Sequence, residues 1–212
     1  MVTLYYVHDP MCSWCWGFTR TWQDLRASLP SHIAIVRLLG GLAADTDTPM
    51  PEATRQMVQD NWQRIESHIP GVKFNFDFWQ RNQPRRATYP ACRAVIAARQ
   101  QGNEYDEAMT AAIQRAYYHE ARNPSNDSTL IELANELGLD SDAFTHALHA
   151  ASTQETLLKE IHQAHAMYVN SFPSLVLANN DSHWPIAIDY NHSQPMLELI
   201  KQYTAPGEDH AG

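Results

Sequence analysis

Two cysteines separated by two residues stand between a β-rich segment and a helical one, and this arrangement constrains the fold more than any other feature. Residues 3–7 read Thr-Leu-Tyr-Tyr-Val, a run typical of a β-strand. After Asp9-Pro10, apolar residues at steps of three and four predict an amphipathic helix to about Pro30: Cys15, Phe18, Trp22, Leu25 and Leu29. The apolar run 33–39, ended by Gly40-Gly41, fits a strand covered on both faces. Together they predict a βαβ unit.

The rest of the chain is mostly helical until its last forty residues or so. Apolar stripes predict helices from about Pro51 to Val169, one of them ending at Gly138. Ser141 is a candidate cap for the next helix, and Ser152 with Glu155 a candidate capping box for the last. Residues 174–178 and 184–189 then flank a polar turn, which predicts a hairpin, and a closing helix follows Ser193. The predicted order is βαβ, a helical block, then ββα.

Composition excludes several classes of protein. The net charge of −9 argues against a nucleic-acid or anionic-membrane partner. Three cysteines are too few for the disulfide framework of a small secreted protein. The first residues lack a basic segment and an apolar stretch of signal-peptide length, and no window approaches a membrane span. We therefore expect a soluble, cytoplasmic protein, in which a Cys-x-x-Cys motif is more often catalytic or metal-binding than structural.

The helical stripe makes the two thiols unequal. Cys15 belongs to the apolar face and should be buried, whereas Cys12 should be exposed, because it lies where the helix begins and its backbone N–H groups are free. Those groups and the helix dipole stabilise a thiolate at Cys12. Such a pair suits dithiol exchange, in which Cys12 reacts with the substrate and Cys15 resolves the mixed disulfide. His8 and Asp9 could tune Cys12 with opposite signs, so their net effect stays open.

Other interpretations of the two cysteines remain. A purely structural disulfide is weak, because so small a ring removes little entropy from the unfolded chain. A zinc site of His8, Cys12 and Cys15 lacks an evident fourth ligand. Two inert buried thiols are the third alternative. The histidine pairs His146/His149 and His162/His165 have helical spacing but no accompanying glutamate pattern, so we expect no metal site.

The motifs DPMCSWCWGF (residues 9–18) and SFPSLVL (residues 171–177), joined by a helical block, resemble the DsbA-like branch of the thioredoxin fold. Within it they look most like cytoplasmic predicted protein-disulfide isomerases of the FrnE type. The resemblance implies an α/β thioredoxin fold with a large all-helical insertion. Residues 1–45 and 170–206 would form the thioredoxin-like domain, and residues 46–169 the inserted helical domain.

The resemblance also implies an active site. The family places a cis proline opposite the Cys-x-x-Cys motif, which here is Pro173. Phe172, before it, is larger than the residue usual in relatives. The expected catalytic residues are Cys12 and Cys15, and the expected substrate-binding residues are Phe172, Pro173 and Trp14. We expect no metal and no cofactor beyond the dithiol, with glutathione as one candidate reductant.

These observations favour a thiol–disulfide oxidoreductase of the reductase or isomerase type, acting on protein or small-molecule disulfides. Two alternatives stay open: a glutathione-dependent transferase or isomerase similar to the kappa class, whose members tend to carry serine in place of Cys12, and a redox-sensing binding module. Cys92 is expected to be an inert core thiol, with a second redox role as the alternative. Four tryptophans could line an apolar groove or fill a core: Trp14, Trp16, Trp79 and Trp184.

Overall fold

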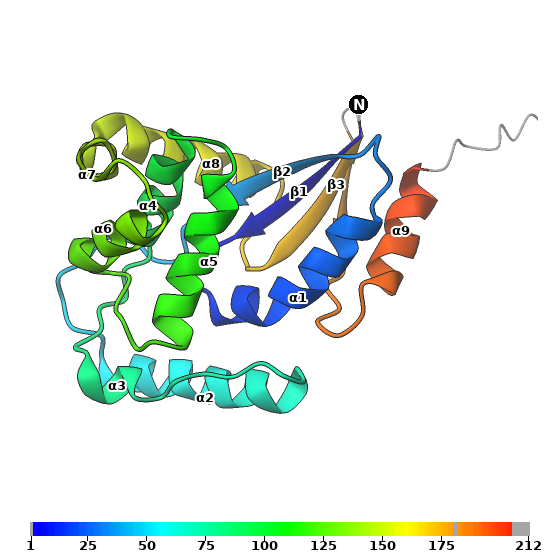
Figure 1. The fold of residues 1–212 in the computed structure, drawn as a ribbon. Coiled ribbons are helices and arrows are strands. Elements are labelled where there is room, and N and C mark those ends of the chain that lie inside the picture. Colours follow the sequence, from blue (N-terminus) through cyan, green and yellow to red (C-terminus); the bar gives the residue numbers. More distant parts are fainter. Residues whose placement is uncertain (1, 180–181, 205–212) are drawn as a thin grey trace, which may run out of the picture.

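The computed structural model describes residues 2–179 and 182–204. Its described strands form one sheet in the order β2-β1-β3-β4 (Figure 1). Their bounds are β1 Val2–His8, β2 Ala34–Leu39, β3 Ser174–Asn179 and β4 Ser182–Ile186. β1 runs parallel to β2 and antiparallel to β3, which pairs antiparallel with β4. Because β1 is central, its C-terminal end carries the cysteine motif into the middle of the molecule.

Helices cover both faces of this sheet. On one face, α1 (Ser13–Ser28) and α9 (Gln194–Thr204) pack on the apolar side chains of β1 and β3, including Leu4 and Leu177. On the other face, α8 (Ala151–Ala166) packs over Val7 and Val176. The period-two alternation of a strand sends successive side chains to opposite faces, so β1 serves both cores.

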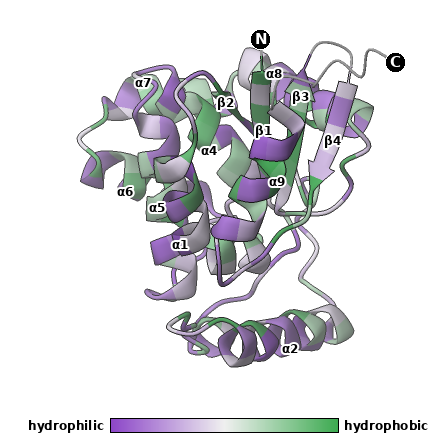
Figure 2. Ribbon diagram, turned by 90° about the vertical axis from the view of Figure 1, so that its right-hand side faces the viewer, coloured by the Kyte–Doolittle hydropathy of each residue, from purple (hydrophilic) through white to green (hydrophobic). Residues whose placement is uncertain are grey.

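The remaining helices form a second core beside the sheet. They are α2 (Glu52–His68), α3 (Phe78–Arg81), α4 (Tyr89–Arg99), α5 (Tyr105–Tyr118), α6 (Asp127–Glu136) and α7 (Ser141–His149). Trp62 is fully buried among aromatic rings of this core. Met11 and Leu39 belong to the same core, which therefore reaches the end of the sheet where the cysteines lie. Figure 2 shows α2 as a rod below the rest of the molecule, with hydrophilic and hydrophobic residues mixed along it.

The predicted fold class is confirmed, and local details differ. β2 is an edge strand whose residues 34–37 are only half-buried, so it is not covered on both faces as expected. β4 begins at Ser182 and ends at Ile186, because the antiparallel register pairs Asn179 with Ser182 and draws polar residues into the sheet. Residues 180 and 181 of the expected turn lie outside the described residues.

Two of the expected helix caps are also wrong. The side chain of Asp140, not Ser141, caps α7 by accepting from the Ala143 N–H at 2.8 Å. α8 begins at Ala151, a residue before Ser152, and has no side-chain cap. Gly138 does end its helix with a positive φ of 74°. The domain boundaries at 45/46 and 169/170 stay a prediction, and residues 205–206 lie outside the described part. None of the described helices is both long and apolar enough to cross a membrane.

Candidate active site

The two cysteines of the motif occupy different positions at the start of α1. Cys12 is the N-cap residue: its N–H donates to the Asp9 carbonyl at 3.0 Å, and its own carbonyl accepts from the Trp16 N–H at 3.1 Å. Cys15, one turn later, is completely buried. All three cysteines are free thiols. Burial, and then the neighbouring Cys12 sulfur, raises the pKa of Cys15 well above its usual value. Cys15 is therefore held as the neutral thiol.

The segment before β3 closes over Cys12. The Cys12 Sγ donates to the Phe172 carbonyl at 3.4 Å, across 160 residues of sequence. The Phe172–Pro173 peptide bond is cis, as the resemblance implied. Cys12 exposes only 6% of its surface, so the expectation of an exposed thiol is wrong in degree. Its covering is this backbone contact, which sequence periodicity alone does not reveal.

The ring of Phe172 lies in a space that a glycine leaves free. A Cβ atom added at Gly40, just after β2, would come within 2.0 Å of the Phe172 ring. Phe172 packs against the core between the sheet and α8, on the face opposite α1. The large residue before Pro173 is thus accommodated by Gly40. The sequence showed this glycine only as the end of a strand.

A buried cluster around Asp9 fixes the loop that leads into Cys12; we call it the Asp9 cluster. Asp9 is fully buried, and its Oδ1 accepts from the Met11 N–H at 2.8 Å. Its Oδ2 accepts from the Leu42 N–H at 2.8 Å, the Thr88 hydroxyl at 2.6 Å and the Cys92 thiol at 3.5 Å. The Asp9 carboxyl group therefore connects the loop before Cys12 to the segment after β2 and to the start of α4.

Burial dominates the protonation chemistry of this cluster. It raises the pKa of Asp9, although the hydrogen bonds from Thr88, Leu42 and Met11 oppose the rise. Burial and then the nearby Asp9 carboxylate raise the pKa of Cys92 well above its usual value. Cys15 lies beside the Cys12 sulfur, whereas the Cys92 thiol donates to the Asp9 carboxylate, and a neutral buried thiol with no neighbouring sulfur is a poor nucleophile. The geometry thus favours the buried-thiol interpretation of Cys92 over a second redox role.

His8 contacts Arg37 and Tyr6. It is 99% buried, and its Nε2 lies 3.1 Å from Nη2 of Arg37, while its ring stacks on Tyr6. Burial and then the positive charge of Arg37 lower the pKa of His8 well below its usual value, so it is neutral. Within residues 2–179 and 182–204, no three His, Cys, Asp or Glu side chains gather as a metal site would need.

Arg37 begins a chain of buried ion pairs that we call the Arg37–Glu160 network. Its Nε lies 3.1 Å from Asp106 Oδ1, and Arg99 Nη2 lies 2.6 Å from Asp106 Oδ2. Arg99 Nη1 in turn lies 2.6 Å from Glu160 Oε1, and the other oxygen of Glu160 accepts from the Leu39 N–H at 2.8 Å. The network joins β2 to α4, α5 and α8.

Trp14, between the two cysteines, is half-buried at the surface of the site. Its indole ring lies 5.1 Å from the Tyr190 ring, and the guanidinium of Arg64 lies 5.7 Å above it. Trp16 lines a hollow along α1. Trp79 is buried in the helical core, and Trp184 stacks on Tyr203. The structure brings together only two of the four tryptophans considered for a groove.

Comparison with known proteins places this site in a family. The sequence profile of the family described as Thioredoxin matches residues 5–198. The chain belongs to the thioredoxin family. A candidate protein disulfide isomerase from Nitrosomonas europaea is 26% identical in sequence, with a TM-score of 0.83 and coverage of 95% of this chain and 97% of that one. The DsbA-like resemblance is thereby confirmed.

Two other relatives of this thioredoxin-family chain have more specific names. The cytosolic disulfide reductase DsbM from Pseudomonas aeruginosa is 24% identical, with a TM-score of 0.74 and coverage of 95% and 98%, a likeness that shows the fold. The ClpXP adapter protein SpxH of Bacillus subtilis is 23% identical over 177 residues, 83% of this chain and 58% of SpxH. The chain thus spans less than two thirds of that relative. Together the comparisons show the DsbA-like thioredoxin fold.

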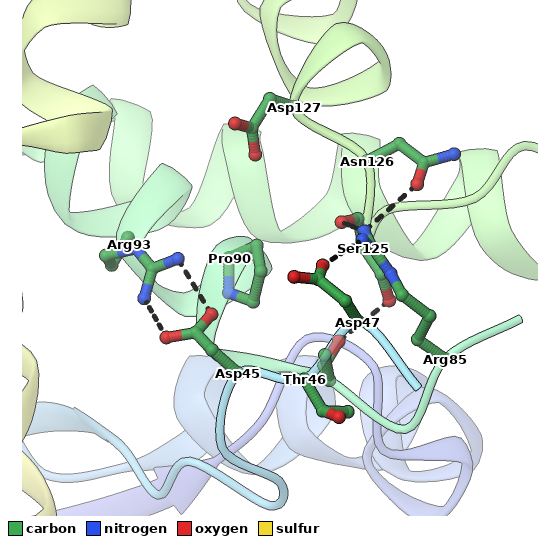
Figure 3. Close-up of a pocket in the computed structure, with 10 residues that line it drawn as sticks. Asp45, Thr46, Asp47, Arg85, Pro90, Arg93, Ser125, Asn126 and Asp127 are labelled. Carbon is green, nitrogen blue, oxygen red and sulfur yellow. Dashed lines mark hydrogen bonds and ion pairs between the residues drawn. The ribbon is translucent and has the colours of Figure 1, made fainter. Parts of the chain in front are cut away.

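A polar cavity of about 460 Å³ lies on another side of the helical block in this thioredoxin-family protein (Figure 3). Both of its arginines are occupied: Arg93 pairs with both oxygens of Asp45, and Arg85 pairs with Asp47 and the Asn126 side chain. These pairs hold the segment that follows Leu42, and so support the Asp9 cluster from outside. The cavity presents no free cation or buried unpaired group among the described residues, and we assign it no ligand.

Proposed function

We propose that the protein is a thiol–disulfide oxidoreductase of the reductase or isomerase type, in which Cys12 and Cys15 form the redox-active dithiol. One observation carries the proposal: Cys12 is the N-cap residue of α1 and its thiol donates to the Phe172 carbonyl, while Cys15, one turn later, is completely buried. Cys12 keeps 6% of its surface exposed and Cys15 none, so a substrate disulfide would react first with Cys12. Phe172 contacts the Cys12 thiol through its carbonyl, and Phe172, Pro173 and Trp14 would contact the substrate.

The exchange proceeds in two balanced steps. The Cys12 thiolate, supported by the free N–H groups of the first turn of α1, attacks one sulfur of a substrate disulfide and releases the other as a thiolate. This thiolate takes the proton of Cys15, whose raised pKa keeps it protonated until then. Cys15 attacks the Cys12 sulfur of the mixed disulfide and frees the second substrate thiol. The protein is left with a Cys12–Cys15 disulfide, and an external thiol must reduce it again.

The proposed direction is reduction or isomerisation in the cytoplasm. A reducing compartment keeps Cys12 and Cys15 in the reduced dithiol state, and glutathione is the candidate reductant. A cytosolic disulfide reductase among the structural relatives, one structure of which contains glutathione, supports this direction. The net charge of −9 agrees with substrates other than nucleic acids.

Reduction of insulin by dithiothreitol, followed as turbidity, tests the proposal. The wild-type protein should accelerate the reaction, and Cys12→Ser should abolish the acceleration because no nucleophile remains. Incubated with insulin after dithiothreitol has been removed, reduced Cys15→Ser should accumulate mixed disulfides with its substrate, visible on non-reducing gels. Cys92→Ser is the matched control and should keep activity, because Cys92 is buried on the far side of Asp9. Activity that survives in Cys12→Ser would disprove the assigned chemistry.

A second candidate function is a protein-binding adapter, which the curated relatives named ClpXP adapter protein favour. In that case the helical block would hold a partner protein, and the dithiol would only report redox state. A variant with both Cys12 and Cys15 replaced by serine separates the two. Full biological activity of this variant would favour the adapter, and its loss would favour the oxidoreductase.

A further inference from the structure

The last turn of α5 lies against the first turns of α1 and carries a tyrosine to which the exchange chemistry gives no role (Figure 1). Tyr118 is completely buried, and its hydroxyl group has no hydrogen-bond partner among residues 2–179 and 182–204. A buried donor without a partner costs free energy, and most buried polar groups in proteins avoid that state. Trp62 and Trp79 of the same core also have unpartnered N–H groups, whereas Tyr118 packs directly on the helix turn that carries the cysteines.

Aromatic neighbours on several sides hold Tyr118 in place. Trp16, directly after the second cysteine, stacks on its ring at 5.7 Å. Met11, directly before the first cysteine, belongs to the same core. The rings of Trp62 and Phe74 meet the Tyr118 ring edge-on, at 5.6 and 5.2 Å between ring centroids. The ring is therefore confined beside the cysteine motif, and the position of its hydroxyl group is fixed.

The hydroxyl group of Tyr118 lies within electrostatic reach of both sulfurs. Burial, and then the charges of Tyr117, Cys12, Cys15 and Asp9, raise the pKa of Tyr118 well above its usual value, so the phenol stays protonated and acts as a donor. Burial also raises the pKa values of Tyr117 and Cys15, which keep their protons. The Asp9 carboxyl group already accepts from its own four donors. The Cys12 sulfur is the neighbour that becomes negatively charged during the exchange.

The partner of Cys12 in the resting protein cannot serve its thiolate. The Cys12 thiol donates to the Phe172 carbonyl at 3.4 Å, a bond that requires the protonated sulfur. A carbonyl group has no proton to donate, so the thiolate loses this bond and needs donors elsewhere. The first N–H groups of α1 are one source. The Tyr118 hydroxyl is a second source, because it is buried beside the same turn with its proton uncommitted.

We propose that the Tyr118 hydroxyl donates a hydrogen bond to the Cys12 thiolate, which makes Tyr118 a further catalytic residue of the dithiol exchange. The inference rests on the proposed function and adds a residue to its mechanism. The hydrogen bond forms when Cys12 loses its proton and breaks when its sulfur enters a disulfide, and Tyr118 keeps its own proton throughout. The unpartnered hydroxyl thus raises the free energy of the resting protein and lowers that of the reactive thiolate.

The pH dependence of Cys12 alkylation tests the proposal. Reduced protein is treated with iodoacetamide at a series of pH values, and modified Cys12 is quantified by mass spectrometry. In Tyr118→Phe the midpoint of the profile should move up by about one pH unit, the roughly tenfold effect of losing a hydrogen bond to a charged group. The rate at high pH should not fall, because a more basic thiolate is at least as nucleophilic. Tyr117→Phe is the matched control and should keep the wild-type midpoint, because Arg86 and Asp9, not the cysteines, are the charges that act on Tyr117.

Two further measurements separate a catalytic role from a structural one. Removal of an unpartnered buried hydroxyl should leave the urea midpoint of Tyr118→Phe unchanged or slightly higher than that of the wild type. Insulin reduction by the same variant at neutral pH should be about threefold slower, because the greater nucleophilicity of the thiolate offsets part of the loss in its population. The difference from the wild type should disappear at alkaline pH, where Cys12 is ionised in both proteins.

The inference is overturned by any of four results. An unchanged alkylation midpoint in Tyr118→Phe would mean that the hydroxyl does not reach the thiolate, and an equal move in Tyr117→Phe would report a general loosening of the core. A rate that falls equally at every pH would mean that the ring only controls access to Cys12. A lower urea midpoint of Tyr118→Phe would mean that the hydroxyl already has a partner in the resting protein.

Failure of this inference is distinguishable from failure of the proposed function. Alkylation needs no disulfide substrate, so the Tyr118→Phe profile can match that of the wild type while insulin reduction persists. The proposed function fails separately, if Cys12→Ser keeps the activity of the wild type.

Discussion

The Asp9 cluster and the Arg37–Glu160 network both join the sheet to the helical block, yet they treat buried charge differently. In the network, two arginines face two carboxylates, and every charge has an opposite partner. In the Asp9 cluster, one carboxyl group is surrounded only by neutral donors, two backbone N–H groups, a hydroxyl and a thiol. The network thus consists of complete ion pairs that stay charged. The Asp9 cluster, next to the cysteines, instead contains a carboxyl group that can change its protonation state.

The difference has a physical origin. An opposite charge at short range stabilises the ionised form and holds it ionised across the usual pH range. Neutral donors compensate a buried charge only in part, and so burial still raises the pKa of Asp9. The region beside Cys12 is therefore the one whose stability should respond to pH, although the Arg37–Glu160 network contains more ionisable groups.

The largest effect is expected from breaking the network. Arg99→Met would leave Asp106 and Glu160 without their shared cation, and removal of one partner from a buried pair costs about 3 kcal/mol or more. Urea unfolding would measure the loss. Arg115→Met, in an exposed ion-pair cluster, is the matched control and should cost below about 1 kcal/mol. Equal losses of stability for the two variants would show that the buried network contributes no more to stability than an exposed ion-pair cluster does.

A smaller, pH-dependent effect is expected for Asp9→Asn. A carboxyl group whose pKa is raised on folding contributes most stability when it is protonated, and this contribution is lost as the pH rises through the raised value. The wild type should therefore lose stability relative to Asp9→Asn as the pH increases from about the ordinary 3.8. Urea unfolding of both proteins between acidic and neutral pH measures the difference. A relative gain by the wild type would show that the hydrogen bonds outweigh burial.

The smallest effect is expected for Cys92→Ala. Its thiol is the longest and weakest of the donors to Asp9, at 3.5 Å, and truncation leaves a small cavity, so we expect a loss of about 1 kcal/mol. Alkylation of Cys12 in the reduced protein should keep its rate within about twofold, since Cys92 acts on the loop only through Asp9. A large change in that rate would restore the second redox role for Cys92.

Features that depend on neighbouring residues could be predicted from the sequence, and features that depend on distant residues could not. The helical stripe through Cys15, Phe18 and Trp22 placed Cys12 at the N-cap of α1, because helical period and first-turn chemistry are local properties. The edge position of β2 was missed, since an apolar run looks the same in a central strand and in an edge strand whose last residues are buried. His8 and Asp9 were seen beside the motif, but neither Arg37 nor Thr88 could be named as a partner.

By itself, the sequence determined the order βαβ, helical block, ββα and the inequality of the two thiols. Both depend on backbone periodicity and on the free N–H groups of a helix start, which neighbouring residues set. Only the tertiary structure decided that Phe172 covers Cys12, that Gly40 leaves room for its ring, that Asp9 is held by residues 42, 88 and 92, and that Arg64 lies over Trp14. Each of these contacts joins segments far apart in the chain. Their partners are selected when separate elements pack and most buried polar groups find a hydrogen-bond partner.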